Sequence, residues 1–217
     1  SNATGAVWVS GGQLTVTNLG AAVGANGVGQ LTVSNGTARF SGLNVARFTG
    51  SVGTLTVAGG TNILTFGLFV GGIAGSTGTV WLTGGQLVTT NTVALSSIGE
   101  SGVGQMTVSN ATLRIDALRV GALFGSRGTM TIAGGTSTFS TSLDIGSGAT
   151  GTVWVTAGLL DAINGTTTVG NFSSGAMTIS NGIVRMQALR IGLNFAGNGT
   201  LTVAGGSAAD KVYDATT

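Results

Sequence analysis

Residues 53–60 read Gly53-Thr54-Leu55-Thr56-Val57-Ala58-Gly59-Gly60, and variants of this phrase recur along the whole chain. Leu55 and Val57 alternate with Thr54 and Thr56, as in a strand with one apolar and one polar face. The Gly-Gly pair tolerates positive φ and bends the chain sharply. The phrase begins nine times at intervals of 23 to 26 residues, at Gly5, Gly29, Gly53, Gly78, Gly104, Gly128, Gly151, Gly175 and Gly199. Self-similarity at a fixed period predicts a repeat architecture.

Two further strand signals fill each repeat. An apolar-x-apolar-Gly phrase closes most repeats, as in residues 118–121 and 143–146, and a weaker strand such as residues 112–115 precedes it. Three short strands in about 24 residues, with no helix between them, match one coil of a parallel β-helix whose coils stack about 4.8 Å apart. A propeller blade is the alternative repeat, but it needs about 40 residues.

We therefore predict an all-β chain that forms a single right-handed parallel β-helix of eight to nine coils over residues 4–206. Residues 1–3, Ser-Asn-Ala, look like the remnant of a cleaved affinity tag. The core is expected to contain the apolar residues of the two strong strand signals, namely Leu55, Val57, Leu118, Val120, Leu143, Ile145, Leu189 and Ile191.

A longer period is superimposed on the coil, because every third repeat shares the same variant of the phrase. The copies at Gly5, Gly78 and Gly151 each carry a tryptophan three residues later, at Trp8, Trp81 and Trp154. The duplicated unit is thus a block of three coils, about 73 residues long. The three tryptophans are expected to project from one face, about 14 Å apart.

Composition excludes several classes of protein. The chain has 217 residues with 41 Gly, no Cys, no His and only 6% charged residues. Without Cys and His, the commonest metal ligands and the commonest general base are missing, and we expect no cofactor or metal. No apolar run approaches the length of a transmembrane helix. The pI of about 9.9 reflects a net charge of only +2, so no nucleic-acid partner is expected.

The repeat over residues 5–206 resembles the Gly-Thr-Leu-Thr-Val-x-Gly-Gly repeats of bacterial type V secretion passengers, of the autotransporter or filamentous-haemagglutinin-like kind, and of proteins with PEP-CTERM sorting signals. Residues 211–217, Lys-Val-Tyr-Asp-Ala-Thr-Thr, resemble the start of a Tyr-Asp-Gly adhesin module, with Ala215 where Gly is usual. Residues 207–217 are accordingly expected to be a linker and the start of the next module. These resemblances imply a large secreted bacterial protein, located outside the cell or on its outer surface.

The few charged residues predict ladder pairs between consecutive coils more readily than an active site. Arg119 and Asp144 occupy the same repeat position one coil apart, as do Asp161 and Arg185. Exposed pairs of this kind are worth at most about 1 kcal/mol. A glycosidase would need two carboxylates flanking a groove, and the nearest candidates, Asp116 and Asp144, fall on different predicted strands. We therefore expect no enzymatic activity.

Two outward surfaces are candidates for binding. The first is a Trp/Thr face that contains Trp8, Trp81, Trp154, Thr56, Thr131 and Thr202. Its tryptophans could stack on sugar rings, or could simply shield the sheet. The second is a basic stripe formed by Arg39, Arg114, Arg119, Arg185 and Arg190, which would attract anionic glycans or form a solvated ladder.

The favoured function is a structural or adhesive shaft, non-catalytic, whose partner is a host or environmental surface glycan or protein. The alternative is a glycan-binding module that uses the Trp/Thr face. Ice binding is the third candidate. Regular Thr-x-Thr rows resemble those of ice-binding solenoids, but a tryptophan in every third coil interrupts the flat lattice. We also expect the chain to associate end to end, because solenoid ends are normally capped.

Overall fold

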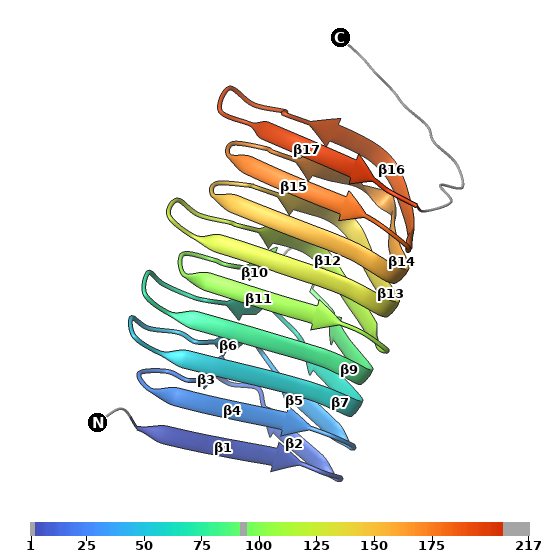
Figure 1. Cartoon of the computed structure of the whole chain (residues 1–217). Helices are drawn as coiled ribbons and strands as arrows, with labels where there is room; N and C mark the ends of the chain where they lie inside the picture. Colours follow the sequence, from blue (N-terminus) through green and yellow to red (C-terminus); the bar gives the residue numbers. More distant parts are fainter. Residues whose placement is uncertain (1–2, 92–94, 206–217) are drawn as a thin grey trace.

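The computed structural model describes residues 3–91 and 95–205, and all regular structure in that part of the chain is β (Figure 1). The first nine strands are β1 (Thr4–Val9), β2 (Gln13–Val16), β3 (Ala21–Val23), β4 (Val28–Val33), β5 (Thr37–Phe40), β6 (Leu43–Val45), β7 (Val52–Leu64), β8 (Leu68–Val70) and β9 (Thr77–Thr89). The others are β10 (Leu95–Ile98), β11 (Val103–Val108), β12 (Thr112–Val120), β13 (Arg127–Ile145), β14 (Thr150–Val169), β15 (Ser174–Ile179), β16 (Ile183–Ile191) and β17 (Asn198–Val203).

The strands stack as coils, and every pairing is parallel. We number the coils 1 to 9 by their opening glycines, which are all in register, from Gly5 opposite Gly29 to Gly175 opposite Gly199. The strand segments after these glycines form the first sheet. The following segments of each coil form a second and a third sheet. The predicted β-solenoid of about eight turns, with roughly 24 residues per turn, is confirmed.

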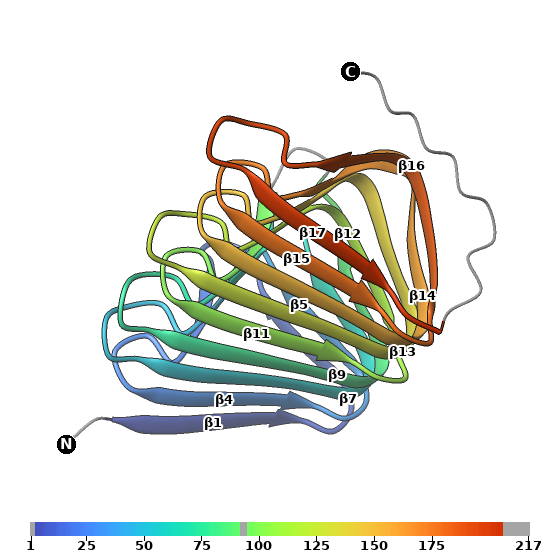
Figure 2. The same cartoon turned by 45° about the horizontal axis from the view of Figure 1, so that its top comes forward.

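The winding is right-handed. In Figure 1 the chain runs from left to right along the near sheet, returns behind it, and climbs from the N-terminal to the C-terminal end. Figure 2 shows that the loops leading from the third sheet into the first lie above one another along one side of the stack. Backbone hydrogen bonds join these loops, such as that from Leu123 N to Glu100 O at 2.9 Å. The corners therefore continue the hydrogen-bond ladder of the sheets.

Several strands are longer than the three short segments expected in each coil. Strand β13 runs continuously through all three sheets, and so does β14. The register nevertheless shifts at the corners, for example between Thr138 and Ser142. The corners are thus bends within extended backbone, and the expectation of three separate strands per coil holds only where a tight turn interrupts the pairing.

The core is a continuous apolar column inside the three sheets. Six of the eight residues predicted to be buried are completely enclosed: Leu55, Val57, Leu118, Val120, Leu143 and Ile145. Leu189 is only partly buried, and the prediction for Ile191 is wrong, because its side chain is 49% exposed. Both residues lie in coil 8, and within the described residues no strand pairs with their outer side.

The opening glycine of each inner coil is required by a close approach of backbone. A Cβ atom added at Gly128 would lie 2.1 Å from the carbonyl oxygen of Ile98, far inside van der Waals contact. At Gly5, in coil 1, the same atom would meet nothing within 4 Å. At Gly199, in coil 9, it would lie 2.0 Å from the carbonyl oxygen of Val169, so the glycine has a steric role wherever a preceding coil lies beneath it.

A second glycine position lies at the corner between the third sheet and the first. Gly121 has φ 71°, in the left-handed region that favours glycine. Ala46 occupies the equivalent corner of coil 2 and has φ 64°, which makes it the one non-glycine residue with positive φ in the described chain. A left-handed conformation costs an alanine about 1–2 kcal/mol, so coil 2 has a strained corner.

The expected domain boundaries are only partly covered by the structure. The predicted linker and module start at residues 207–217 lie outside the described residues, as do the first two residues of the predicted tag remnant. In the described part of the chain no helix is long and apolar enough to cross a membrane.

Candidate functional site

The Trp/Thr face is the outer surface of the first sheet, and its central row is continuous. The row reads Trp8, Thr32, Thr56, Trp81, Thr107, Thr131, Trp154, Thr178 and Thr202, each opposite the next in the register. The exposed fractions of Trp8, Trp81 and Trp154 are 71%, 44% and 43%. The alternation predicted from sequence is confirmed, because the indoles lie outside and the neighbouring aliphatic residues inside. Three tryptophans recur along one row, every third coil.

Local packing explains the different exposure of the three tryptophans. Thr56 and Thr131 lie opposite Trp81 and Trp154 in the preceding coil, so each of these two tryptophans has a neighbouring residue on both sides of its row. Trp8 belongs to coil 1, whose strand β1 pairs only with β4 among the described residues. An aromatic residue next to a β-branched residue shields the sheet and stabilises it by up to about 1 kcal/mol. The tryptophans of the Trp/Thr face are therefore placed both to shield the first sheet and to contact a ligand.

The five arginines of the proposed basic stripe fall into two separate rows. Arg39, Arg114 and Arg185 share one row of the second sheet, but Ile63 and Val88 stand between the first two. Arg119 and Arg190 share a row of the third sheet, with Asp144 and Thr168 between them. Since uncharged or acidic residues interrupt both rows, the positive charge is local rather than continuous.

The ladder pair Arg119 and Asp144 is placed side by side, as the sequence predicts. Both side chains are only partly exposed, and Arg119 Nε is buried without a hydrogen-bond partner. Burial raises the pKa of the Asp144 carboxyl above its usual range, against the opposing effects of a hydrogen bond from Thr168 and of the Arg119 and Arg190 charges. The expectation of a solvated pair is therefore wrong for these two residues. Asp161 and Arg185 are likewise in register.

Sequence reasoning missed a groove on the second sheet, over coils 5 to 7. It has a volume of about 390 Å³ and is lined by Thr112, Arg114, Thr136, Thr138, Phe139, Asp161, Ile163 and Asn164. Its wall comes from the corner between the second and third sheets. One residue forms this corner in coil 5, two form it in coil 6, and three form it in coil 7. This increase in corner length was the only available signal, and Ile163 and Asn164 of the longest corner line the groove.

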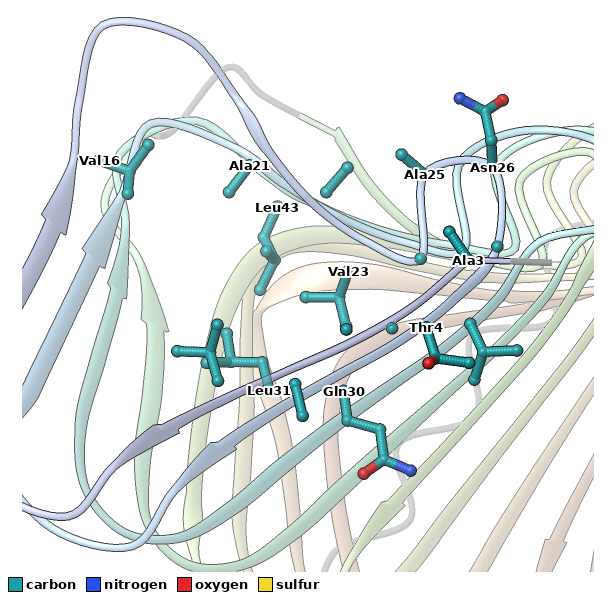
Figure 3. A pocket seen from close by; sticks show the side chains of 18 of the residues that line it. Ala3, Thr4, Val16, Ala21, Val23, Ala25, Asn26, Gln30, Leu31 and Leu43 are labelled. Carbon is teal, nitrogen blue, oxygen red and sulfur yellow. The ribbon is translucent and has the colours of Figure 1, made fainter.

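A larger hollow, of about 700 Å³, lies at the N-terminal end of the solenoid. Figure 3 shows Val16, Ala21, Val23, Leu31 and Leu43 around it. These side chains are the inward-facing residues of coils 1 and 2. The hollow is thus the open end of the core column rather than a cleft lined with reactive groups.

No set of three or more His, Cys, Asp or Glu side chains in residues 3–91 and 95–205 is grouped so that it could hold a metal ion. Comparisons with protein-family models, with curated proteins and with solved structures found no match to this chain.

Proposed function

We propose that the chain is a rigid, non-catalytic shaft that holds other parts of a larger extracellular protein at a fixed separation. The observation that supports this role most directly is the unbroken register of nine coil-opening strands. In such a stack each coil contacts only its neighbours, and the backbone ladder and the core column both run along the axis.

Rigidity follows from the way the coils are joined. Each inner coil donates and accepts backbone hydrogen bonds on both sides in three sheets, so bending the axis would open one or more ladders and expose core residues. Buried backbone groups without partners are costly. The location outside the cell, or on its outer surface, rests on the resemblance of the repeat to bacterial passenger and adhesin repeats.

The shaft is tested by measuring the distance between its ends. The chain has no cysteine, so Thr15→Cys and Arg185→Cys place two spin labels on one row of the second sheet, seven coils apart. At about 4.8 Å per coil the expected separation is about 34 Å. Pulsed electron paramagnetic resonance should give one narrow distance distribution.

A matched pair provides the control. Arg39→Cys with Arg185→Cys spans one coil fewer, so its distribution should shift by about 5 Å without broadening. A broad distribution in both pairs, or a shift that does not follow the coil count, would contradict a rigid shaft.

A second candidate function is glycan binding by the Trp/Thr face. The observation that favours it is the exposure of three indoles on one row of one sheet. Linked weak sites add through effective concentration, so single Trp→Ala changes should weaken polysaccharide binding modestly and the triple change should abolish it. If the indoles only shield the sheet, the changes will lower the melting temperature and leave any adhesion intact. Measuring thermal hysteresis would test the third candidate, ice binding.

A further inference from the structure

The groove over coils 5 to 7 differs from the rest of the described second sheet in its combination of shape and polar groups. Its floor is the row of Arg114, Thr138 and Asp161, which are opposite one another in consecutive coils. Its wall includes Ile163 and Asn164, in the longest of the three corners. Arg114 and Asp161 therefore flank Thr138 in the row, each on a strand about 4.8 Å from that of Thr138.

The polar groups of the groove are available to a ligand. In the described part of the chain no hydrogen bond or ion pair involves the Arg114 guanidinium or the hydroxyls of Thr136 and Thr138. The Asp161 carboxylate accepts one long hydrogen bond, 3.4 Å, from the backbone N of Ile163. That bond ties the carboxylate to the wall of the groove and orients it.

The three-coil block provides an internal comparison. Arg39 occupies in the first block the position that Arg114 occupies in the second. The residues after Arg39 in the row are Ile63 and Val88, where Arg114 has Thr138 and Asp161. An arginine at this position is thus a general feature of the block, whereas within residues 3–91 and 95–205 the hydroxyl, the carboxylate and the long corner occur together only after Arg114.

We propose that this groove binds a neutral sugar unit of a polysaccharide. Sugar hydroxyls both donate and accept hydrogen bonds, and the groove offers a donor in Arg114, an acceptor in Asp161 and hydroxyls that do both. Ile163 is 49% exposed and provides an apolar surface for the C–H face of a pyranose ring. The volume falls at the small end of the range typical of ligand pockets, about 300–1,000 Å³.

Charge decides between a neutral sugar and the other small polar ligands. The lining contains one arginine and one aspartate, so it has no net charge and offers no second cation for a polyanionic glycan. A zwitterionic amino acid would use the two charges but would leave the three threonine hydroxyls of the lining, Thr112, Thr136 and Thr138, without a function. The proposal concerns a different sheet from the Trp/Thr face and does not depend on the shaft.

The test uses the whole chain and defined probes. Cellotetraose, maltotetraose and laminaritetraose are titrated separately into ¹⁵N-labelled protein, with trigalacturonate and glycine as charged comparators. At least one neutral tetrasaccharide should shift amide signals in residues 112–115, 136–141 and 161–165. Arg114→Ala and Asp161→Asn should each weaken that binding about tenfold or more, because a site that hydrogen-bonds hydroxyls loses affinity when a partner is removed.

Two controls distinguish binding in this groove from binding elsewhere on the solenoid. Arg39→Ala removes the equivalent arginine of the first block and should leave the affinity unchanged. The triple variant W8A/W81A/W154A should also retain the shifts in the groove, whatever its effect on the first sheet. The proposal is overturned if no neutral probe shifts these amides, if only glycine or trigalacturonate does so, or if Arg39→Ala weakens binding as much as Arg114→Ala.

Discussion

Coil 5 and coil 8 end in nearly the same sequence, Leu118-Arg119-Val120-Gly121 and Leu189-Arg190-Ile191-Gly192, but only the first is enclosed. Val120 is completely buried, whereas Ile191 is 49% exposed. The tryptophans differ in the same way, because Trp8 in coil 1 is much more exposed than its counterparts in coils 4 and 7. Burial in this fold is therefore a property of the stack, and each coil depends on two neighbours.

The largest effect should come from a side chain added at an opening glycine. In Gly128→Val the Cβ atom would lie 2.1 Å from the Ile98 carbonyl oxygen, so the coils must separate, whereas Gly5→Val has open space. We expect Gly128→Val to cost more than about 3 kcal/mol or to prevent folding. Gly5→Val should change the free energy of unfolding by less than about 0.5 kcal/mol. Urea unfolding would measure both, and equal effects would refute the role assigned to the inner glycines.

A smaller difference should separate two leucines at one repeat position. Leu118 is completely buried and Leu189 only partly. Leu118→Ala should cost about 2–5 kcal/mol, as expected for a leucine truncated in a packed core. Leu189→Ala should cost about 1 kcal/mol, because its site is partly open and loses less buried apolar area. If urea unfolding gives the larger loss at Leu189, coil 8 is more tightly packed than the structure indicates.

Among the described residues, β1 and β17 each pair with one strand only, so the two ends of the stack should associate weakly and in one preferred register. Where the third coil of a block meets the first coil of the next, Thr54 pairs with Thr79 and Thr129 with Thr152. We propose that β17 of one copy continues this pattern on β1 of another, which places Thr200 opposite Ala6. The separation of paired strands suits a disulfide.

Chains with Ala6→Cys and Thr200→Cys should form a ladder of disulfide-linked oligomers on oxidation at high protein concentration. The control variant keeps Ala6 and places the first cysteine at an inner coil instead, as Thr152→Cys with Thr200→Cys. This variant should remain largely monomeric on a non-reducing gel. Equal cross-linking in the two variants would mean that the copies do not meet in the register that places Thr200 opposite Ala6.

The smallest effect is expected at the strained corner of coil 2. Ala46 has φ 64°, and its counterpart Gly121 has φ 71°. Ala46→Gly should raise the free energy of unfolding by about 0.5–1 kcal/mol, because glycine adopts this conformation without steric cost. Thermal unfolding would detect the gain. A loss of stability would show that the greater chain entropy of glycine in the unfolded state exceeds the relief of strain.

The sequence predicted the register and the inward or outward direction of the strands, because both depend on a strict period that is visible in the Gly-x-apolar-x-apolar phrase. The exposure of Ile191 and the partial burial of Arg119 could not be predicted, since each depends on which coils cover the residue rather than on its own motif. The groove at Arg114 was missed for another reason. It arises from corners that lengthen by one residue per coil, and this irregularity appears only when the coils are aligned in space.

The central claim is that each coil is stabilised by its two neighbours, and amide hydrogen exchange resolved by residue tests it most directly. In the first sheet, the amides of Met106 and Met130, in coils 5 and 6, should exchange slowest. Those of Val7 and Val203, at the two ends, should exchange fastest, with a graded change between them. Uniform protection along the stack, or faster exchange in coils 5 and 6 than at the ends, would contradict the claim.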